Sequence, residues 1–163
     1  MKPPIVVVLN DVKPVPWRNG RGSTQVVWNV PSLRVSVASL ISDAQFSDFT
    51  GFYRFFLLLD GVVDLMIDGQ ERCLQPLQSV HFAGHVPVSC RVKQASRAVN
   101  IMSPSRLSLA AGHYTTLPAG TRAVVLDAKG CRPGDLVQGP WNQSFFGVVL
   151  PGLDEANGLT GSI

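Results

Sequence analysis

The segment of residues 16–22, Pro-Trp-Arg-Asn-Gly-Arg-Gly, combines side chains that could recognise a small anionic molecule. Its proline and two glycines disfavour regular structure, which leaves a loop. The guanidinium groups of Arg18 and Arg21 present planar sets of donors that match a carboxylate. Asn19 adds both a donor and an acceptor, and Trp17 adds a flat apolar wall. The same residues also fit a packed loop with Trp17 in the core and both arginines in solvent, so two interpretations stay open.

Two polar residues that lie within apolar segments need partners inside the fold. Arg54 lies in the apolar run of residues 52–59, and Asn100 lies within residues 98–102. A charge in such a run is costly unless it is paired or faces a wet cavity, and a buried amide must be hydrogen-bonded. Each residue therefore suits either a ligand contact or a structural role. The carboxylates available for a structural ion pair with Arg54 are those of Asp48, Asp60 and Asp64.

The histidines and cysteines do not form a metal-binding pattern. His81 and His85 are four residues apart, a spacing that brings two side chains together on a helix, but Gly84 and Pro87 disfavour a helix there. The three cysteines lack the paired spacing of zinc sites and disulfide frameworks. No phosphate-binding loop, dinucleotide fingerprint or serine-hydrolase motif occurs. We therefore expect no metal, no other cofactor and no catalytic residue.

The elements that position these residues are predicted to be β-strands. Residues 32–40 alternate in character, with Leu33, Val35 and Val37 on an apolar face and Arg34 on the other. This period of two is typical of a strand with one buried face. No stretch of the sequence has a convincing helical period.

Two Asp-Gly pairs, at residues 60–61 and 68–69, predict tight hairpin turns between apolar runs. Further short strands are predicted at residues 52–59, 62–67, 71–74, 79–82, 86–92, 98–102, 123–126 and 145–150. About ten short strands separated by turn residues favour an all-β sandwich or a closed barrel, because these architectures hide the edges of an antiparallel chain.

The composition excludes several functional classes. The chain has 163 residues, a length that predicts one compact folding unit, and a net charge of +3. The basic residues are spread singly along the sequence, so we do not expect binding to nucleic acid. No segment approaches the roughly 20 apolar residues that a membrane span requires. We expect a cytoplasmic protein with no membrane partner.

Four segments resemble the HutD/Ves family: residues 16–22, 46–54, 82–91 and 100–102. The resemblance covers roughly positions 14 to 104, in matching order. It implies a cupin-like (RmlC-type) double-stranded β-helix barrel, arranged as a compact one-and-a-half or double cupin. On this basis we expect a main barrel in residues 1–104 and a second, reduced cupin-like half in residues 105–163.

The resemblance also implies a function. The family is associated with bacterial histidine utilisation, where it is thought to bind a small acidic metabolite, such as a formylglutamate-like compound, and to act in regulation. It brings no established enzymatic activity. Its motifs fall on the residues that we predict to bind the ligand, which are Trp17, Arg18, Asn19, Arg21, Arg54 and Asn100. The sequence departs from the family pattern at Arg21, Tyr53 and Ala98, so a shifted ligand or a loss of binding stays open.

The leading hypothesis is a metal-free cupin that binds a small carboxylate metabolite as a sensor. The alternative is a cupin-type enzyme, an isomerase or hydrolase-like protein, that acts on a small sugar or acid without a metal. It would use His81, His85 or Tyr53 as a general acid or base. A third hypothesis is an interaction module in which the second half forms a homodimer.

Overall fold

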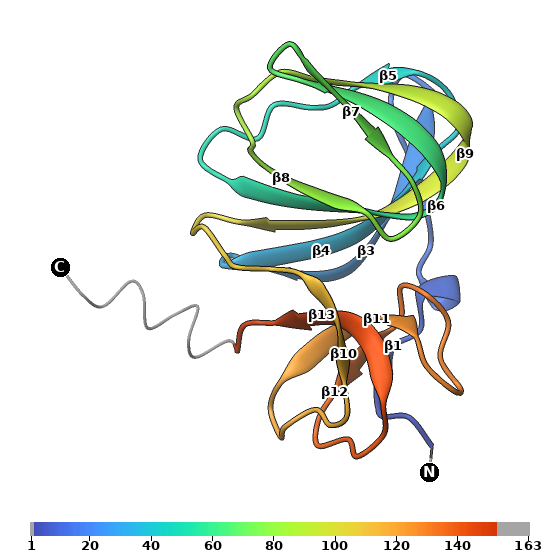
Figure 1. Ribbon diagram of the computed structural model, residues 1–163, viewed down its shortest axis with the longest axis vertical. Helices are drawn as coiled ribbons and strands as arrows, with labels where there is room; N and C mark the ends of the chain where they lie inside the picture. The colour runs from blue at the N-terminus through green and yellow to red at the C-terminus, as the bar shows by residue number, and fades with distance from the viewer. Residues whose placement is uncertain (1, 153–163) are drawn as a thin grey trace, which may run out of the picture. The chain divides into compact units, whose positions relative to one another are not determined.

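The computed structural model describes residues 2–152 and consists almost entirely of β-strands (Figure 1), which confirms the all-β prediction. Within these residues the one helical element is a short 3-10 turn, η1 (Leu9–Asp11). No helix of the described chain has the length and apolar character that crossing a membrane requires. The chain divides into a larger unit, residues 13–107, and a smaller unit formed by residues 2–12 and 108–152.

The larger unit contains strands β2 to β9. Their bounds are β2 (Val15–Pro16), β3 (Gly22–Val30), β4 (Leu33–Leu40), β5 (Ala44–Gln45), β6 (Tyr53–Ile67), β7 (Gln70–Leu74), β8 (Ser79–Ala83) and β9 (Val88–Ser103). The main sheet has the order β2-β3-β4-β9-β6-β7, with β5 paired to β9 and β8 paired to β6. All of the strand pairs are antiparallel.

The two longest strands, β6 and β9, hold this unit together. The first part of β6 pairs with β8 and with the end of β9, whereas its last part pairs with β7 and with the start of β9. Register shifts interrupt the β6–β9 ladder between Leu58 and Val63. Both strands therefore curve from one layer of strands to the other (Figure 1), as strands with bulges do at the corners of packed sheets.

One of the two predicted hairpin turns is wrong. Asp60 and Gly61 lie inside β6, where they form the bulge instead of a reversal. Gly61 has a φ of +81°, and a Cβ atom there would lie 1.9 Å from Ser96 Oγ, so this position requires glycine. The other turn is confirmed, because residues 68–69 connect β6 to β7 with φ angles of +49° and +78°. The prediction of two separate strands at residues 86–92 and 98–102 is also wrong, because the structure has one continuous strand there, β9.

The alternation predicted for residues 32–40 is present in β4, but the predicted exposure of its second face is wrong. Val35 and Val37 are fully buried, as expected. Ser36 and Ala38 are also buried, because their face lines the interior of the unit. The rest of this interior is an apolar cluster that includes Leu40, Phe56, Leu58, Val63, Leu65, Leu74, Phe82, Val88, Cys90 and Ala98.

The smaller unit is a five-stranded antiparallel sheet with its own core. Its strands are β1 (Ile5–Val7), β10 (Ala111–Tyr114), β11 (Arg122–Asp127), β12 (Leu136–Gln138) and β13 (Phe145–Leu150), in the order β1-β12-β11-β13-β10. The N-terminal residues belong here because β1 pairs with β12 and the Leu9 amide donates to Asp135 Oδ1 over 2.9 Å. The main barrel expected from the resemblance, residues 1–104, includes these residues, whereas the structure pairs them with the smaller unit. Residues 153–163 of the expected second half lie outside the described chain.

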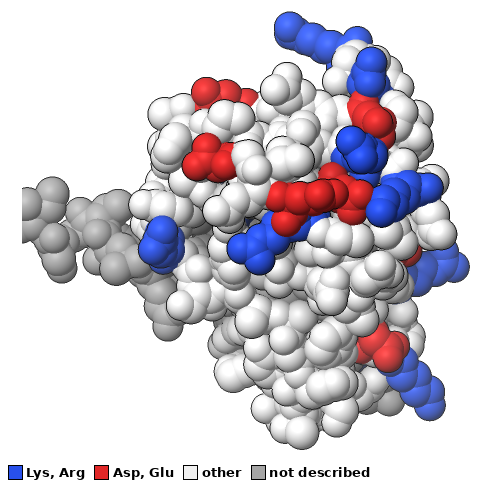
Figure 2. Space-filling model, turned by 45° about the horizontal axis from the view of Figure 1, so that its top comes forward, with Lys and Arg blue, Asp and Glu red and all other residues white. Residues whose placement is uncertain are grey.

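Charged side chains of both signs are interleaved on the surface that Figure 2 displays. On the larger unit, Asp64 of β6 lies opposite Arg91 of β9, and its Oδ2 is 3.1 Å from Lys93 Nζ. Nearer the bulge, Asp60 Oδ2 is 2.9 Å from Arg97 Nη2. The charges on these strands are therefore arranged in local pairs.

Candidate functional site

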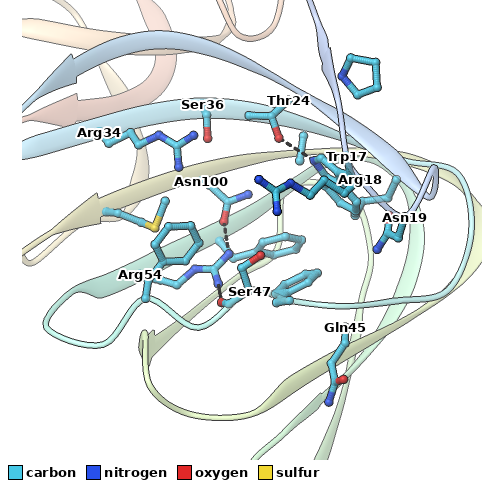
Figure 3. Close-up of a pocket in the computed structure, with 17 residues that line it drawn as sticks. Trp17, Arg18, Asn19, Thr24, Arg34, Ser36, Gln45, Ser47, Arg54 and Asn100 are labelled. Carbon is cyan, nitrogen blue, oxygen red and sulfur yellow. Dashed lines mark hydrogen bonds between the residues drawn. The ribbon is translucent and has the colours of Figure 1, made fainter.

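A cavity of about 480 Å³ lies inside the larger unit. Its wall combines apolar side chains with polar ones from the β2–β3 hairpin, β4, β6 and β9 (Figure 3). None of the residues that line it is acidic, and three of them, Arg18, Arg34 and Arg54, are arginines. Figure 3 shows the three guanidinium groups pointing toward one common space. The cavity therefore has a positive electrostatic potential.

The register of three neighbouring strands places the deepest of these side chains. Arg34 of β4 and Arg54 of β6 each lie opposite Met102 of β9. In the next row, Ser36 and Phe56 lie on either side of Asn100. Directly opposed residues share one face of a sheet, so both rows point into the cavity.

Arg54 is buried, with 7% of its surface exposed. Its Nη2 donates to Oδ1 of Asn100 over 3.2 Å, and its Nη1 makes a longer contact of 3.4 Å with the carbonyl oxygen of Ser47. Its Nε is buried without a hydrogen-bond partner in the described residues. Burial, and then the nearby charge of Arg34, lower the pKa of Arg54 to about 10, so the side chain stays protonated at neutral pH.

None of the three carboxylates considered as partners neutralises Arg54. Asp60 pairs with Arg97, Asp64 pairs with Lys93, and Asp48 accepts hydrogen bonds from Thr50. Within residues 2–152 Arg54 therefore has no carboxylate partner.

Aromatic rings surround this guanidinium group instead. Its Cζ lies 5.1 Å from the ring centroid of Phe46, 5.3 Å from that of Phe49 and 5.1 Å from that of Phe82. Such cation–π contacts offset part of the cost of burying a charge. They leave the charge itself without an anion.

The β2–β3 hairpin supplies the residues at one side of the cavity. The Trp17 amide donates to the Gly22 carbonyl and Trp17 Nε1 donates to Thr24 Oγ1 over 2.8 Å, which fixes the indole ring. Trp17 both packs against the apolar cluster and lines the cavity, so it combines the two roles that the sequence left open. Arg18 and Asn19, at the exposed tip of the hairpin, also line the cavity.

The structure does not bring Arg21 to this cavity. Its side chain turns to another face of the unit, where Nη1 donates to the carbonyl oxygen of Asp43. The other five predicted residues, Trp17, Arg18, Asn19, Arg54 and Asn100, all line the cavity. Sequence reasoning missed Arg34, Phe46 and Phe49 as site residues.

The side chains proposed for acid–base catalysis lie elsewhere. Neither His81, His85 nor Tyr53 lines the cavity. His81 of β8 lies opposite Phe55 of β6, and the centroids of their rings are 4.9 Å apart. Because Phe55 follows Arg54 directly in β6, the two side chains point to opposite faces of the sheet. Among the described residues no three His, Cys, Asp or Glu side chains come together in a way that could hold a metal ion.

The chain is similar to known proteins over most of its length. A family model named HutD matches residues 9–132. A curated relative, an uncharacterized 21.2 kDa protein in the hutC 3′ region of Pseudomonas putida, is 32% identical over 91 residues, which cover 50% of this chain and 48% of the relative. The chain thus matches about half the length of that relative.

Solved structures share the fold. A conserved protein of unknown function from Pseudomonas aeruginosa PAO1 gives a TM-score of 0.70 at 23% identity, covering 88% of this chain and 94% of that protein. HutD from Pseudomonas fluorescens SBW25 gives 0.66 at 24% identity, with coverages of 89% and 91%. An RmlC-like cupin from Shewanella frigidimarina gives 0.52 at 14% identity, with coverages of 60% and 87%. The cupin-like fold is therefore confirmed, and the match of the family model shows that this chain belongs to the HutD family.

Proposed function

We propose that this protein binds a small carboxylate metabolite in the cavity of its larger unit and acts in the cytoplasm as a sensor linked to histidine utilisation. The observation that carries the proposal is Arg54, which is a buried cation without a carboxylate partner in the described residues. A buried charge is costly when it has no counter-ion. An anionic ligand would supply one.

The surroundings of Arg54 support a carboxylate as that ligand. Burial, and then the charge of Arg34, lower the pKa of Arg54, and the second cause is a repulsion between the two like charges. A carboxylate between them would relieve this repulsion and accept charge-assisted hydrogen bonds from both guanidinium groups. Arg18 enters from the exposed hairpin and would add a third donor near the opening.

The remaining wall would orient the ligand. Asn100 holds the Arg54 guanidinium through its side-chain oxygen, while Asn19 and Ser36 offer polar groups elsewhere on the wall. Trp17 and Phe46 offer flat apolar surfaces. A few polar groups in a mainly apolar wall are typical of sites for small metabolites.

The link to histidine utilisation comes from the family. The relative from Pseudomonas putida is named for its place in the hutC 3′ region, and the sequence resemblance implies a role in the same pathway. Acidic intermediates of histidine degradation, such as N-formylglutamate, are therefore the first candidates. No observation on the described residues favours the alternative of a cupin-type enzyme.

Thermal denaturation with added ligands tests the proposal. N-Formylglutamate, glutamate and succinate form one arm, neutral sugars a second arm, and divalent cations with a chelator control a third. A ligand that binds only the folded state adds about 2.7 kcal/mol of stability at 100 times its Kd. We expect stabilisation in the carboxylate arm alone.

Two arginine variants assign the effect to the cavity. Arg54→Met removes the buried charge and should abolish most of the carboxylate-induced shift. Arg106→Met removes the same charge from a side chain that lies over the ring of Tyr53 and lines no part of the cavity, so it should keep the full shift. Equal carboxylate binding by Arg54→Met and the parent protein would show that the assigned site is wrong.

A further inference from the structure

A second cavity of about 440 Å³ adjoins the first one in the larger unit. It lies at the turn between β3 and β4, where Asn29, Val30 and Pro31 form part of its wall. Phe52, from the segment that precedes β6, contributes an aromatic ring. Apart from Asn29 and Arg34, all of the side chains that line this second cavity are apolar.

The two cavities share part of their walls. Arg34, Phe49 and Met102 line both of them. The Arg34 guanidinium lies 6.0 Å from the ring centroid of Phe49, so these two side chains are adjacent at the boundary. Arginine and methionine have long side chains with several rotatable bonds, so both can adopt other rotamers around a ligand.

The strand register shows that the cavities lie along one line. Asn29 of β3 is opposite Arg34 of β4, which is opposite Met102 of β9, which is opposite Arg54 of β6. This row of four side chains begins in the second cavity and ends at the buried guanidinium of the first. A ligand bound at Arg54 would therefore have to pass Met102 and Arg34 to reach Asn29.

We propose that the two cavities form one elongated site and that its ligand is an acid with an apolar substituent. The carboxylate binds at Arg54, and the substituent lies past Arg34 and Phe49 in the second cavity. This inference rests on the proposed binding of a carboxylate in the first cavity. It adds that a dicarboxylate without an apolar substituent would leave the second cavity empty.

Phe52 gives this assignment a specific contact. Its side chain is large and apolar, yet 37% of its surface is exposed. With Val30 and Pro31 it forms an apolar wall that an alkyl, acyl or aryl group would cover. When such a group binds, the apolar surfaces of the wall and of the ligand are both removed from water, and this burial favours binding.

Calorimetric titration with acetate, butyrate, hexanoate and octanoate tests the inference. These acids share one carboxylate and differ only in the length of the alkyl chain. Octanoate has four methylenes more than butyrate, and full burial of one methylene raises affinity by about fourfold. Burial of even half of this added chain should therefore raise the affinity by about tenfold or more. Dependence on Arg54 is checked with Arg54→Met for acetate and for octanoate.

A pair of neighbouring aromatic residues provides the matched variants. Phe52→Ala removes one aromatic ring from the wall of the second cavity and should lower octanoate affinity by about fivefold or more, while acetate affinity stays within about twofold. Tyr53→Ala removes a ring of similar exposure, 39%, that lines neither cavity, and should leave both affinities unchanged. Circular dichroism of both variants serves as the control for folding, and their spectra should match that of the parent protein.

The outcomes separate this inference from the proposed function. If acetate binds through Arg54 but chain length has no effect, the proposed function stands and the elongated site is wrong. An equal gain with length in Phe52→Ala and the parent would place the alkyl chain in the first cavity and also overturn the inference. If no carboxylate binds in an Arg54-dependent way, both are wrong.

Discussion

Arg54 and Asn100 are hydrogen-bonded across adjacent strands although they do not lie opposite each other. Nη2 of Arg54 is 3.2 Å from Oδ1 of Asn100, whereas the residue opposite Arg54 is Met102. A neutral amide thus orients the guanidinium group without neutralising it. The charge remains available to a ligand, and this distinguishes the pair from a structural salt bridge.

This relationship predicts that Asn100→Asp removes anion binding while the fold is kept. The new carboxylate would pair with Arg54 and compete with the ligand, so the affinity for N-formylglutamate or succinate should fall by more than about tenfold. The melting temperature without ligand should rise, because the buried cation gains a partner. Asn142→Asp makes the same change at an exposed residue of the smaller unit and should alter neither quantity. Unchanged affinity in Asn100→Asp would contradict the assigned role of Arg54.

Removing the charge should cost little stability. Arg54→Met loses two hydrogen bonds with a net value of about 1 kcal/mol each, but it also removes an uncompensated buried charge. The free energy of unfolding in urea should therefore stay within about 1 kcal/mol of the parent value or increase. Phe56→Ala, on the same strand and face, should lose about 3–5 kcal/mol by comparison. A similar loss in both variants would show that Arg54 is mainly a structural residue.

Gly22 sets the position of the Trp17 indole ring. A Cβ atom at residue 22 would lie 2.4 Å from the Ser39 carbonyl oxygen and 2.8 Å from an indole carbon of Trp17. Gly22→Ala should therefore displace the ring, change its fluorescence, and destabilise the protein by about 1–3 kcal/mol. Gly112→Ala, where the new atom makes only ordinary contacts, should stay close to the parent protein. An unchanged indole spectrum in Gly22→Ala would exclude this packing role.

The strands were predictable where local pattern decides the structure. Residues 145–150 form β13 with the predicted bounds, and the turn at residues 68–69 follows from its Asp-Gly pair. The pair at residues 60–61 has the same local signal, but there the ladder with β9 continues past the bulge and Ser96 packs against Gly61. Pairing between residues distant in sequence determines that conformation, and the local sequence around residues 60–61 carries no information about this pairing.

The candidate site was predictable only in part for a related reason. Arg54 and Asn100 were found because a polar residue in an apolar run signals a special environment. Arg34 was missed because the alternation in residues 32–40 was interpreted as one buried face and one solvent face. In a strand whose second face lines a cavity, the polar positions are the site residues.

The exposed thiol of Cys73 provides a pH-dependent prediction outside the cavity. A hydrogen bond to the Asp64 carboxylate is the main cause that raises the pKa of Cys73 and lowers the pKa of Asp64. Thiolates are the species that iodoacetamide alkylates, so the raised pKa moves the labelling of Cys73 to higher pH. Asp64→Asn removes the negative charge, lowers the thiol pKa and should accelerate labelling at pH 8.

Site-resolved mass spectrometry measures this rate against internal references. Burial raises the pKa of Cys90 to about 12 and that of Cys131 to about 11, so both should react more slowly than Cys73 in the folded protein. Asp60→Asn makes the same substitution at a carboxylate that pairs with Arg97 instead, and should leave the Cys73 rate unchanged. If Asp64→Asn and Asp60→Asn label Cys73 equally, the thiol is not controlled by Asp64. The rates of Cys73 labelling in the parent and in Asp64→Asn should differ at pH 8 and become equal above the Cys73 pKa of both proteins. Such a result would identify the fraction of thiolate as the cause of the difference.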